Sequence, residues 1–324
     1  MKQNTSENSR DASKGLESII QISGCRGERK TGICGDDLPD YRKYGDSNKE
    51  IERKTKMIKK LTALILVCIT LSALVCGCAQ KTEEPTEYIG IISAMDNEID
   101  LLLKEAVIDR VDTVADVKYH VGRLHGQPVV ITRAGIGKIR VSSGVTTMLN
   151  KYPISKVVFT GIAGGVADET QVLDEVIASR LVEHDYGILS NDGFEWRSGD
   201  PGFGNEAGVY YDCDPQLIQL AYDAAVEVVG ENHVFKGTVA TGDQFIANSE
   251  YVKKLQDDYN AYACEMEGAA AAVVCIKYKT PFVVIRALSD KADGNAHESY
   301  ENFGDRAADN SSRIVMKMLD AIGE

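Results

Sequence analysis

Short apolar runs recur along the chain from residue 88 onward, and they predict the strands of a buried sheet. The runs cover residues 88–94, 117–124, 128–134, 156–160, 175–181, 236–241, 259–264 and 281–288. Most are nearly continuous apolar segments bounded by turn residues, a pattern typical of strands that are covered on both faces. Residues 117–124 and 128–134 are predicted to pair as a hairpin around His125 and Gly126.

Helical segments separate these runs. They are predicted just after residue 95, with an acidic first turn, and over residues 139–150, 215–229, 248–256, 269–277 and 307–322. The start at 215 is the clearest, because Asp214 can cap the helix and Pro215 suits its first turn. Since strands alternate with helices, we predict one α/β domain over residues 88–324, with three α/β/α layers around a mixed, mainly parallel central sheet.

Glycine-rich stretches mark places where the backbone turns or approaches another group. Residues 135–138 read GIGK before a predicted helix, which is a weak phosphate-binding signal and equally a tight strand-to-helix turn. Residues 161–165 contain three glycines and predict a sharp bend close to a ligand. Residues 191–214 are polar and glycine-rich, and a loop of this length is predicted to be a functional lid or interface.

The first 87 residues have a different character. Residues 1–56 are polar without periodicity, so we predict a disordered and non-native extension, with Met57 as the true initiator. Residues 57–78 combine a basic start, an apolar stretch and a terminal cysteine, and they resemble the signal of bacterial lipoproteins, with Cys78 as the lipidated residue. A transmembrane anchor is the alternative, but the stretch is shorter than the roughly 20 residues of a full span. Residues 79–87 would then be a tether, and the domain would be extracytoplasmic and lipid-anchored to the bacterial cell membrane.

Charge and cysteine content narrow the classes of ligand. The net charge of −13 would repel a phosphate backbone, so no nucleic acid is expected as a partner, whereas a small neutral or cationic ligand remains open. The eight cysteines and five histidines show no zinc-ligand spacing, so neither a metal site nor a cofactor is predicted. Cys264 and Cys275 lie in apolar contexts and are predicted to be small buried hydrophobes.

Acidic residues stand at three predicted strand ends, where open α/β sheets bind their ligands. Residues 265–267 read EME directly before a predicted helix, where a carboxylate near the helix dipole can stay ionised and face a pocket. An ordinary first-turn acid is an equally good interpretation of that stretch alone. Glu98 follows the first strand and Asp290 ends the last one. Arg286 lies inside an apolar strand and requires an acidic or pocket partner.

Six motifs now occur in a single order. They are GIISAM at 90–95 with Glu98, GIGK at 135–138, TGIAGG at 160–165, GDQFI at 242–246, EME at 265–267 and RALSD at 286–290. Together they resemble the 5′-methylthioadenosine/S-adenosylhomocysteine nucleosidases of the nucleoside phosphorylase superfamily, over residues 88–324. The resemblance implies hydrolysis of the N-glycosidic bond of an adenine nucleoside, a nucleoside phosphorylase-like fold and a homodimer.

The resemblance also implies roles for individual residues. Asp290 would be the general acid toward purine N7, and Glu98 would activate the attacking water. Substrate contacts would come from Met95, Ala163, Gly164, Phe245, Ile246, Met266, Glu267, Arg286 and Ser289.

Within that set, each contact has an implied purpose. Glu267, ionised, and the Met266 backbone would hold the ribose hydroxyls, and Met95 would line the sugar pocket. Phe245 would stack on the purine while Ile246 backbone groups read its edge. Arg286 would hold Glu98 or the water, and Ser289 would orient Asp290.

Two departures from the family pattern and two rival functions remain. The family often has serine where this chain has Ile162, and residues 191–211 align poorly, so the preferred 5′-substituent stays open. A purine nucleoside phosphorylase is the nearest rival, but a carboxylate at Glu98 would repel phosphate. A lipid-anchored nucleoside-binding protein is the other rival, although such proteins typically have two lobes and this domain is short for that.

Overall fold

The computed structural model describes residues 50–65, 85–197 and 210–322. The chain divides into two compact units, Met1–Lys81 and Thr82–Glu324. In the first unit, residues 50–65 form an exposed helix. Residues 50–56 therefore differ from our expectation of disorder, and Cys78 lies outside the described residues. Among the described helices, none combines the length and the apolar character needed to cross a membrane.

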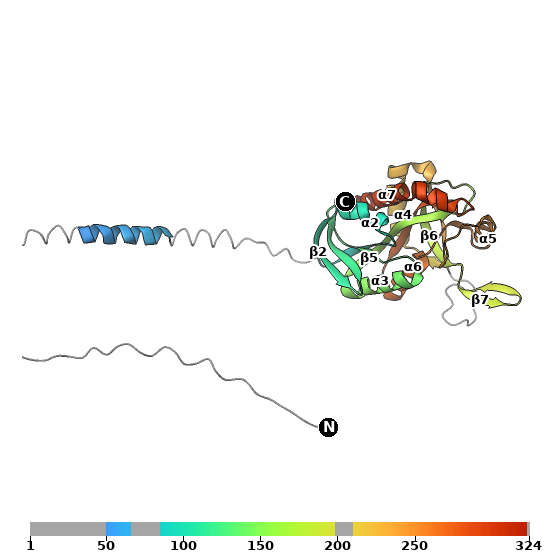
Figure 1. The fold of residues 1–324 in the computed structure, drawn as a ribbon, viewed down its shortest axis with the longest axis horizontal. Helices are drawn as coiled ribbons and strands as arrows, with labels where there is room; N and C mark the ends of the chain where they lie inside the picture. The colour runs from blue at the N-terminus through green and yellow to red at the C-terminus, as the bar shows by residue number, and fades with distance from the viewer. Residues whose placement is uncertain (1–49, 66–84, 198–209, 323–324) are drawn as a thin grey trace, which may run out of the picture. The chain divides into compact units, whose positions relative to one another are not determined.

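The second unit contains one large sheet and a separate hairpin (Figure 1). The strands are β1 (Tyr88–Ser93), β2 (Val107–Val114), β3 (Val117–Leu124), β4 (Gln127–Arg133), β5 (Ile154–Gly165), β6 (Glu175–Glu183), β7 (Gly187–Ser190), β8 (Gly193–Trp196), β9 (Tyr211–Asp212), β10 (Val234–Thr241), β11 (Ala261–Glu265) and β12 (Phe282–Asp290). The helices are α2 (Asp96–Glu105), α3 (Lys138–Lys151), α4 (Pro215–Val229), the 3₁₀ turn η1 (Glu231–His233), α5 (Ser249–Tyr259), α6 (Gly268–Tyr278) and α7 (Ala296–Ile322).

The large sheet runs in the order β11-β10-β6-β12-β5-β1-β4-β3-β2, with β9 beside β6. The central pairings β12–β5, β5–β1, β1–β4 and β6–β10 are parallel, whereas β2–β3, β3–β4 and β6–β12 are antiparallel. The predicted mixed, mainly parallel sheet is thus confirmed. β11 pairs with β10 and also with β5, so that β5, β12, β6, β10 and β11 close into a ring of hydrogen-bonded strands.

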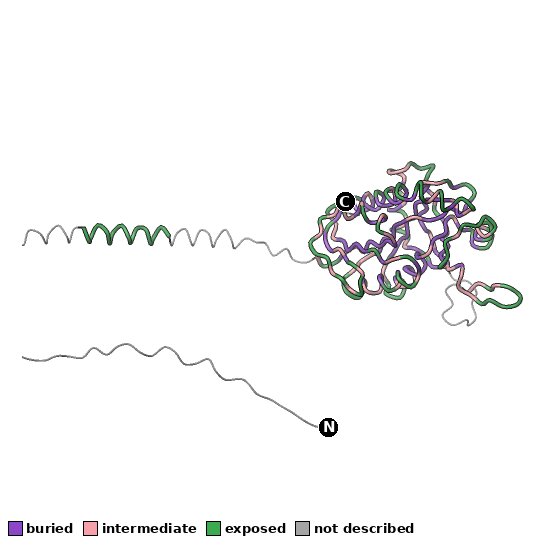
Figure 2. Tube along the Cα trace, in the orientation of Figure 1, coloured by how far each residue is buried: buried purple, intermediate pink, exposed green. Residues whose placement is uncertain are grey.

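Helices cover both faces of the sheet, which confirms the three predicted layers. Figure 1 shows α2, α4 and α7 on one side of β5 and β6, with α3 and α6 on the other. Each face has its own apolar core, one around Ile91, Val158 and Ile285 and the other around Phe159 and Val284. All nine residues of β12 are buried, as a strand covered on both faces requires, and Figure 2 shows the buried chain running through the middle of the unit.

Several element boundaries differ from the predictions for physical reasons. β5 continues through Gly165, so residues 161–165 extend a strand instead of forming a bend. α7 begins at Ala296 rather than at 307, because its first turns are polar and carry little apolar periodicity. Part of the predicted long loop forms the β7–β8 hairpin, while residues 198–209 lie outside the described part of the chain.

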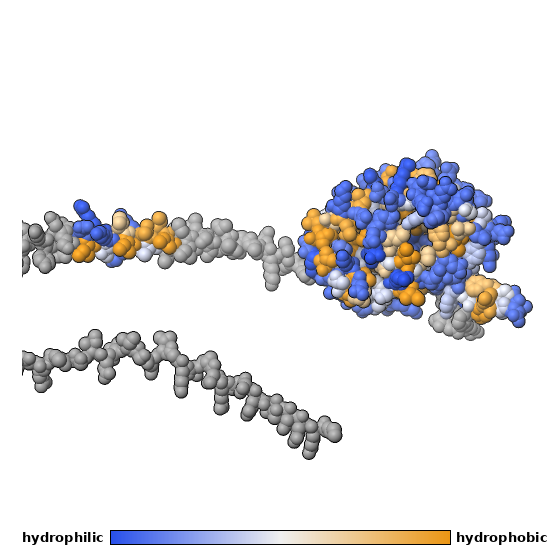
Figure 3. All heavy atoms as spheres, in the orientation of Figure 1, coloured by the Kyte–Doolittle hydropathy of each residue, from blue (hydrophilic) through white to orange (hydrophobic). Residues whose placement is uncertain are grey.

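The edge strand β2 was not predicted, because charged residues interrupt its apolar pattern. Val107 and Val111 are 69% and 47% exposed there. Figure 3 shows hydrophobic residues gathered at this end of the unit, on a face that is otherwise mostly hydrophilic. An exposed apolar edge strand is a surface on which another chain can pack.

A carboxyl group without a partner lies in the core beside this framework. Glu175, the first residue of β6, is fully buried, and neither of its oxygens has a hydrogen-bond partner among the described residues. Burial and the neighbouring charge of Asp174 hold the pKa of Glu175 well above its ordinary value of 4.5. The side chain therefore stays protonated in the folded protein at a pH where the unfolded chain has released its proton.

We expect Glu175→Leu to stabilise the protein, and to do so more strongly as the pH rises above 4.5. In that range the unfolded wild-type chain binds fewer protons than the folded one, so the free energy of unfolding falls with pH, and the leucine variant lacks this dependence. Relieving an unpaired buried polar group contributes on the order of 2 kcal/mol. Thermal unfolding of both proteins at acidic and neutral pH tests this, and a difference independent of pH would contradict it.

Candidate active site

A cavity of about 340 Å³ opens at the carboxyl ends of β1, β5, β10, β11 and β12. Its lining residues are Ala94, Met95, Glu98, Ile136, Ile162, Ala163, Gly164, Gln244, Phe245, Ile246, Cys264, Glu265, Met266, Glu267, Ser289, Asp290, His297 and Tyr300. Most of these residues are apolar and a few are convergent acids, which is the usual make-up of a small-molecule site.

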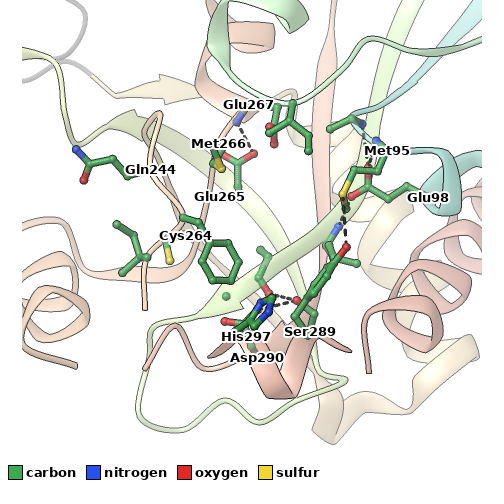
Figure 4. Close-up of a pocket in the computed structure, with 18 residues that line it drawn as sticks. Met95, Glu98, Gln244, Cys264, Glu265, Met266, Glu267, Ser289, Asp290 and His297 are labelled. Atoms are coloured by element: carbon green, nitrogen blue, oxygen red, sulfur yellow. Dashed lines mark hydrogen bonds between the residues drawn. The ribbon is translucent and has the colours of Figure 1, made fainter. Parts of the chain in front are cut away.

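The cavity brings the predicted site residues together. Glu98, Asp290 and every predicted substrate-contact residue except Arg286 line it. Figure 4 shows Met95 and Glu98 at one side, Gln244 and Cys264 at the opposite side, and Asp290 along a third. These side chains come from segments far apart in the sequence, and only the sheet brings them to one place.

Glu98 lies in the first turn of α2, directly after β1, and it is 3% exposed. Its carboxylate accepts three backbone N–H groups, from Ala94 at 2.9 Å, Met95 at 2.8 Å and Ile162 at 2.9 Å. Burial raises the pKa of Glu98, against the lowering effects of the nearby Arg286 charge and these hydrogen bonds. The contact from Ile162 comes from its main chain, so the departure from serine at that position does not remove it.

Asp290 is the last residue of β12 and is 2% exposed. It accepts hydrogen bonds from the Ser289 hydroxyl at 2.7 Å and from the Ala292 N–H at 2.7 Å. Burial raises the pKa of Asp290, partly offset by those two hydrogen bonds, and the nearby Asp293 charge raises it further. The carboxyl group can therefore carry a proton at a higher pH than an ordinary aspartate and deliver it into the cavity.

The two acids that flank Met266 have different tasks. Glu265 accepts the backbone N–H groups of Glu267 at 3.0 Å and Gly268 at 2.7 Å, together with the Thr241 hydroxyl. Glu265 thus neutralises the start of α6, which is the ordinary first-turn role that the sequence left open.

Glu267 is the acid of this pair whose free side faces the ligand space. Its Oε1 accepts the Gly137 N–H at 2.7 Å across 130 positions of sequence. Burial, followed by the charge of Glu265, raises the pKa of Glu267 to about 8. The protonated form of Glu267 is thus favoured more than in an ordinary glutamate, and the expected ionised Glu267 stays a prediction.

Arg286 does not line the cavity, and no hydrogen bond to Glu98 is among its described contacts, so its predicted role of holding Glu98 or the water stays a prediction. Its Nη2 instead donates to Glu265 at 2.7 Å, and its guanidinium stacks 4.2 Å from the ring centre of Phe159. It is 1% exposed, so its charge acts through a medium of low dielectric and lowers the pKa values of Glu98 and Glu267. Arg286 supports the acids from behind the wall of the site.

Two glycines of β5 leave room for the catalytic candidates. A Cβ atom at Gly161 would clash with Oε1 of Glu98, and one at Gly164 would lie 2.9 Å from Oδ1 of Asp290. The glycine-rich segment 161–165 therefore allows side chains of this protein to approach the strand, which is a different purpose from the predicted bend.

The turn at 135–138 holds carboxylates of the protein itself. Gly137 has a φ of 94°, and its N–H binds Glu267, while the N–H of Lys138 binds Asp243 at 2.9 Å. The Lys138 ammonium also pairs with Asp185 at 2.7 Å. The first donors of α3, where a phosphate would be expected to sit, are thus already engaged.

Sequence reasoning missed part of the lining. Gln244, Cys264, Glu265, His297, Tyr300 and Ile136 line the cavity without having been assigned to it. His297 and Tyr300 lie in the first turns of α7, which are polar, so no apolar periodicity pointed to these two residues. Phe245, predicted to stack on a purine, lines the cavity with 53% of its surface exposed.

In the described part of the chain, no cluster of three or more His, Cys, Asp or Glu residues has the arrangement of a metal site.

Comparison with known proteins gives one consistent answer. Residues 88–320 match the model of the phosphorylase superfamily. The nucleosidase for 5′-methylthioadenosine and S-adenosylhomocysteine from Bacillus subtilis is 35% identical over 236 residues, which are 72% of this chain and 99% of that protein.

Solved structures of the same kind of enzyme have the same fold. An aspartate-to-asparagine variant from Helicobacter pylori with 5′-methylthioadenosine in its active site superimposes with a TM-score of 0.65 at 30% identity, covering 72% of this chain and 98% of that one. The Neisseria meningitidis enzyme in complex with methylthio-immucillin-A gives 0.65 and 30%, covering 73% and 100%. The chain therefore belongs to the phosphorylase superfamily, and within it to the family of 5′-methylthioadenosine/S-adenosylhomocysteine nucleosidases.

Proposed function

We propose that this protein hydrolyses the N-glycosidic bond of 5′-methylthioadenosine and S-adenosylhomocysteine, releasing adenine and the thioribose product. The observation that carries the proposal is the convergence of Glu98, Glu267 and Asp290 on one cavity, each in a different hydrogen-bond environment. Relatives that match this chain over 98–99% of their own length are named for this activity.

At the purine end, Asp290 supplies the proton. Breaking the glycosidic bond leaves electrons on the purine, and protonation of its N7 turns it into a neutral leaving group. The raised pKa of Asp290 keeps the proton available, and the Ser289 hydroxyl fixes the carboxyl group in place. Phe245 offers its exposed face to the adenine ring, and backbone groups of Ile246 lie beside it to read the edge.

At the sugar end, Glu98 orients a water and takes its proton as the oxygen attacks the anomeric carbon. Three N–H donors hold the Glu98 carboxylate still, which supplies the fixed geometry that this step requires. Glu267 and the Met266 backbone bind the ribose hydroxyls. Positive charge that develops on the sugar favours the ionised form of Glu267, so this acid stabilises the transition state more than the ground state.

A phosphorylase is the nearest alternative, and it is tested by adding phosphate. We expect adenine release from 5′-methylthioadenosine at a rate that does not change with phosphate, because carboxylates occupy the first donors of α3 and Glu98 repels a second anion. The assay follows adenine and sugar products with and without phosphate. Formation of a sugar 1-phosphate would instead identify a phosphorylase, and binding without any turnover would identify a nucleoside-binding protein.

We also propose that the enzyme acts as a homodimer. Ile136 lines the cavity at 45% exposure and the neighbouring Ile139 is 83% exposed, so an apolar surface continues from the site onto α3. A second copy covering this surface would remove it from water. Light scattering of the purified protein tests the proposal, and a monomer at catalytic concentrations would contradict it.

We further propose that Cys78 is lipidated and tethers the enzyme outside the cytoplasm. The basic start, apolar stretch and cysteine of residues 57–78 support this. Labelling cells with a fatty-acid analogue should mark the wild-type protein and spare Cys78→Ala. Equal labelling of both, or release of both into the soluble fraction, would rule the anchor out.

A further inference from the structure

A second cavity, of about 500 Å³, adjoins the sugar side of the active site. The two cavities share Ala94, Met95 and Ile136 as lining residues. The remaining lining of the second cavity is Asp96, Arg133, Gly135 and Arg140. Three apolar residues therefore border both the cavity of the catalytic acids and a second cavity whose wall carries charge of both signs.

Arg140 is held at this wall by the turn before α3. Its Nη1 donates to the Ile136 carbonyl at 2.9 Å, and its Cδ would lie 3.0 Å from a Cβ atom placed on Gly135. The side chain thus lies across the bare backbone of Gly135, whose φ is 96°. Nη1 also lies about 4 Å from where a Cβ of Gly137 would be, and Gly137 is the residue whose N–H binds Glu267.

Arg133 and Asp96 form the other part of the wall. Arg133 Nε lies 2.8 Å from Asp96 Oδ1, and their side chains are 48% and 76% exposed. Arg133 ends β4, and Asp96 begins α2 directly after Met95. Two guanidinium groups and one carboxylate therefore surround the second cavity, and all three are exposed in the single chain.

The direction of a bound nucleoside follows from the acids. In the binding mode proposed above the sugar lies beside Glu98 and Met95, and Figure 4 shows these two residues on the side opposite Gln244 and Cys264. In that binding mode a substituent on the 5′-carbon can extend past Met95 and Ile136, which also line the second cavity.

We propose that Asp96, Arg133 and Arg140 form a subsite for a zwitterionic α-amino acid at the end of a 5′-thio substituent. The inference rests on the proposed nucleosidase function. Homocysteine in S-adenosylhomocysteine has this chemistry, with its carboxylate matched to the guanidinium groups and its ammonium to Asp96. A methyl substituent is too short to reach them. The subsite therefore favours S-adenosylhomocysteine over 5′-methylthioadenosine.

Four substrates of equal chain length separate the charges. They are S-adenosylhomocysteine and the 5′-thioadenosines that carry 3-carboxypropyl, 3-aminopropyl and butyl groups. Arg140→Gln should lower kcat/KM for S-adenosylhomocysteine and the carboxypropyl compound about fivefold relative to the butyl compound, mainly by raising KM. The expected effect is modest because solvent-exposed charge contacts are individually weak. The double variant Arg133→Gln/Arg140→Gln should lower it by about tenfold or more.

Asp96→Asn should weaken binding of the substrate's ammonium group. It should lower kcat/KM for the homocysteinyl and aminopropyl substrates and leave kcat/KM for the carboxypropyl substrate unchanged. High salt should reduce the preference of the wild type for charged substituents, since exposed charges are screened beyond roughly 10 Å at 0.1 M salt. Arg123→Gln is the matched control, because Arg123 is also an exposed arginine bound to a nearby carbonyl, that of Gly126 at 3.2 Å.

The outcomes distinguish failure of the proposed subsite from failure of the proposed nucleosidase activity. If Arg140→Gln and Asp96→Asn leave the order of the four substrates unchanged, or lower all four equally, the subsite does not exist. If wild-type protein turns over none of the four, the nucleosidase function itself fails. If phosphate competes with the carboxypropyl compound and accelerates sugar release, the arginines serve phosphate, and the amino-acid subsite is overturned.

Discussion

Asp290→Asn should reduce kcat for 5′-methylthioadenosine by about 10²–10⁴-fold, the usual contribution of a positioned general acid. Asparagine fills the same space: its Oδ1 can accept the Ala292 N–H while its amide NH2 donates to the Ser289 oxygen, so the fold and KM should change little. What is lost is the proton for the purine, without which the leaving group departs as an anion. Steady-state kinetics, with thermal unfolding measured in parallel, checks both halves of this expectation.

The matched control is Asp293→Asn, which removes a nearby charge that raises the pKa of Asp290 without touching the acid itself. Its kcat should stay close to that of the wild type. The pH profile gives a second control. Activity of the wild type should fall as the pH rises through the pKa of Asp290, and Ser289→Ala should move that alkaline limb upward, since the Ser289 hydrogen bond lowers this pKa. Near-normal turnover by Asp290→Asn would remove Asp290 from the role of acid.

Glu98→Gln should lower kcat by a similar factor, about 10²–10⁴-fold, because an amide cannot take the proton of the attacking water. In the wild type the activity should also fall as the pH drops through the pKa of Glu98, which burial raises above its ordinary value. The variant should lose this acid limb. Measuring kcat/KM against pH for both proteins reveals the difference.

The structural cost of this change must be measured separately. An amide has one acceptor oxygen, whereas the Glu98 carboxylate accepts three N–H groups, so Glu98→Gln leaves at least one donor poorly matched. Glu98→Asp keeps the charge but shortens the reach, and it therefore serves as the comparison. If Glu98→Gln keeps the acid limb and most of the activity, another group activates the water.

The sequence allowed prediction of the elements whose signals are local. The buried strands β1, β5 and β12 are continuous apolar runs. Asp214 and Pro215 mark the start of α4 through contacts within its first turn. The family motifs then pointed to the acids, because each stands directly at the end of such a strand. These signals do not depend on what lies across the sheet.

The remaining features depend on distant partners. Glu265 and Glu267 stand on either side of Met266, and only the pairing of the surrounding strands decides that one caps α6 while the other reaches Gly137. The sequence predicted that Arg286 requires an acidic partner, but it did not distinguish among Glu98, Glu265 and Glu267, on all of which the Arg286 charge acts. In the folded protein Arg286 binds Glu265 and packs over the ring of Phe159, and neither partner is close to it in sequence.

The ring formed by β5, β12, β6, β10 and β11 bears on how this enzyme can be engineered. Because β11 pairs with both β10 and β5, the strand ends that precede Glu267 and carry Asp290 are linked by a closed ring of main-chain hydrogen bonds. The opposite edge of the sheet, where β12 begins, carries none of the three acids. A peptide tag inserted at the exposed Lys279, between α6 and β12, should therefore be tolerated, and reporter sequences or surface-attachment handles can be placed there with the least risk to the chemistry.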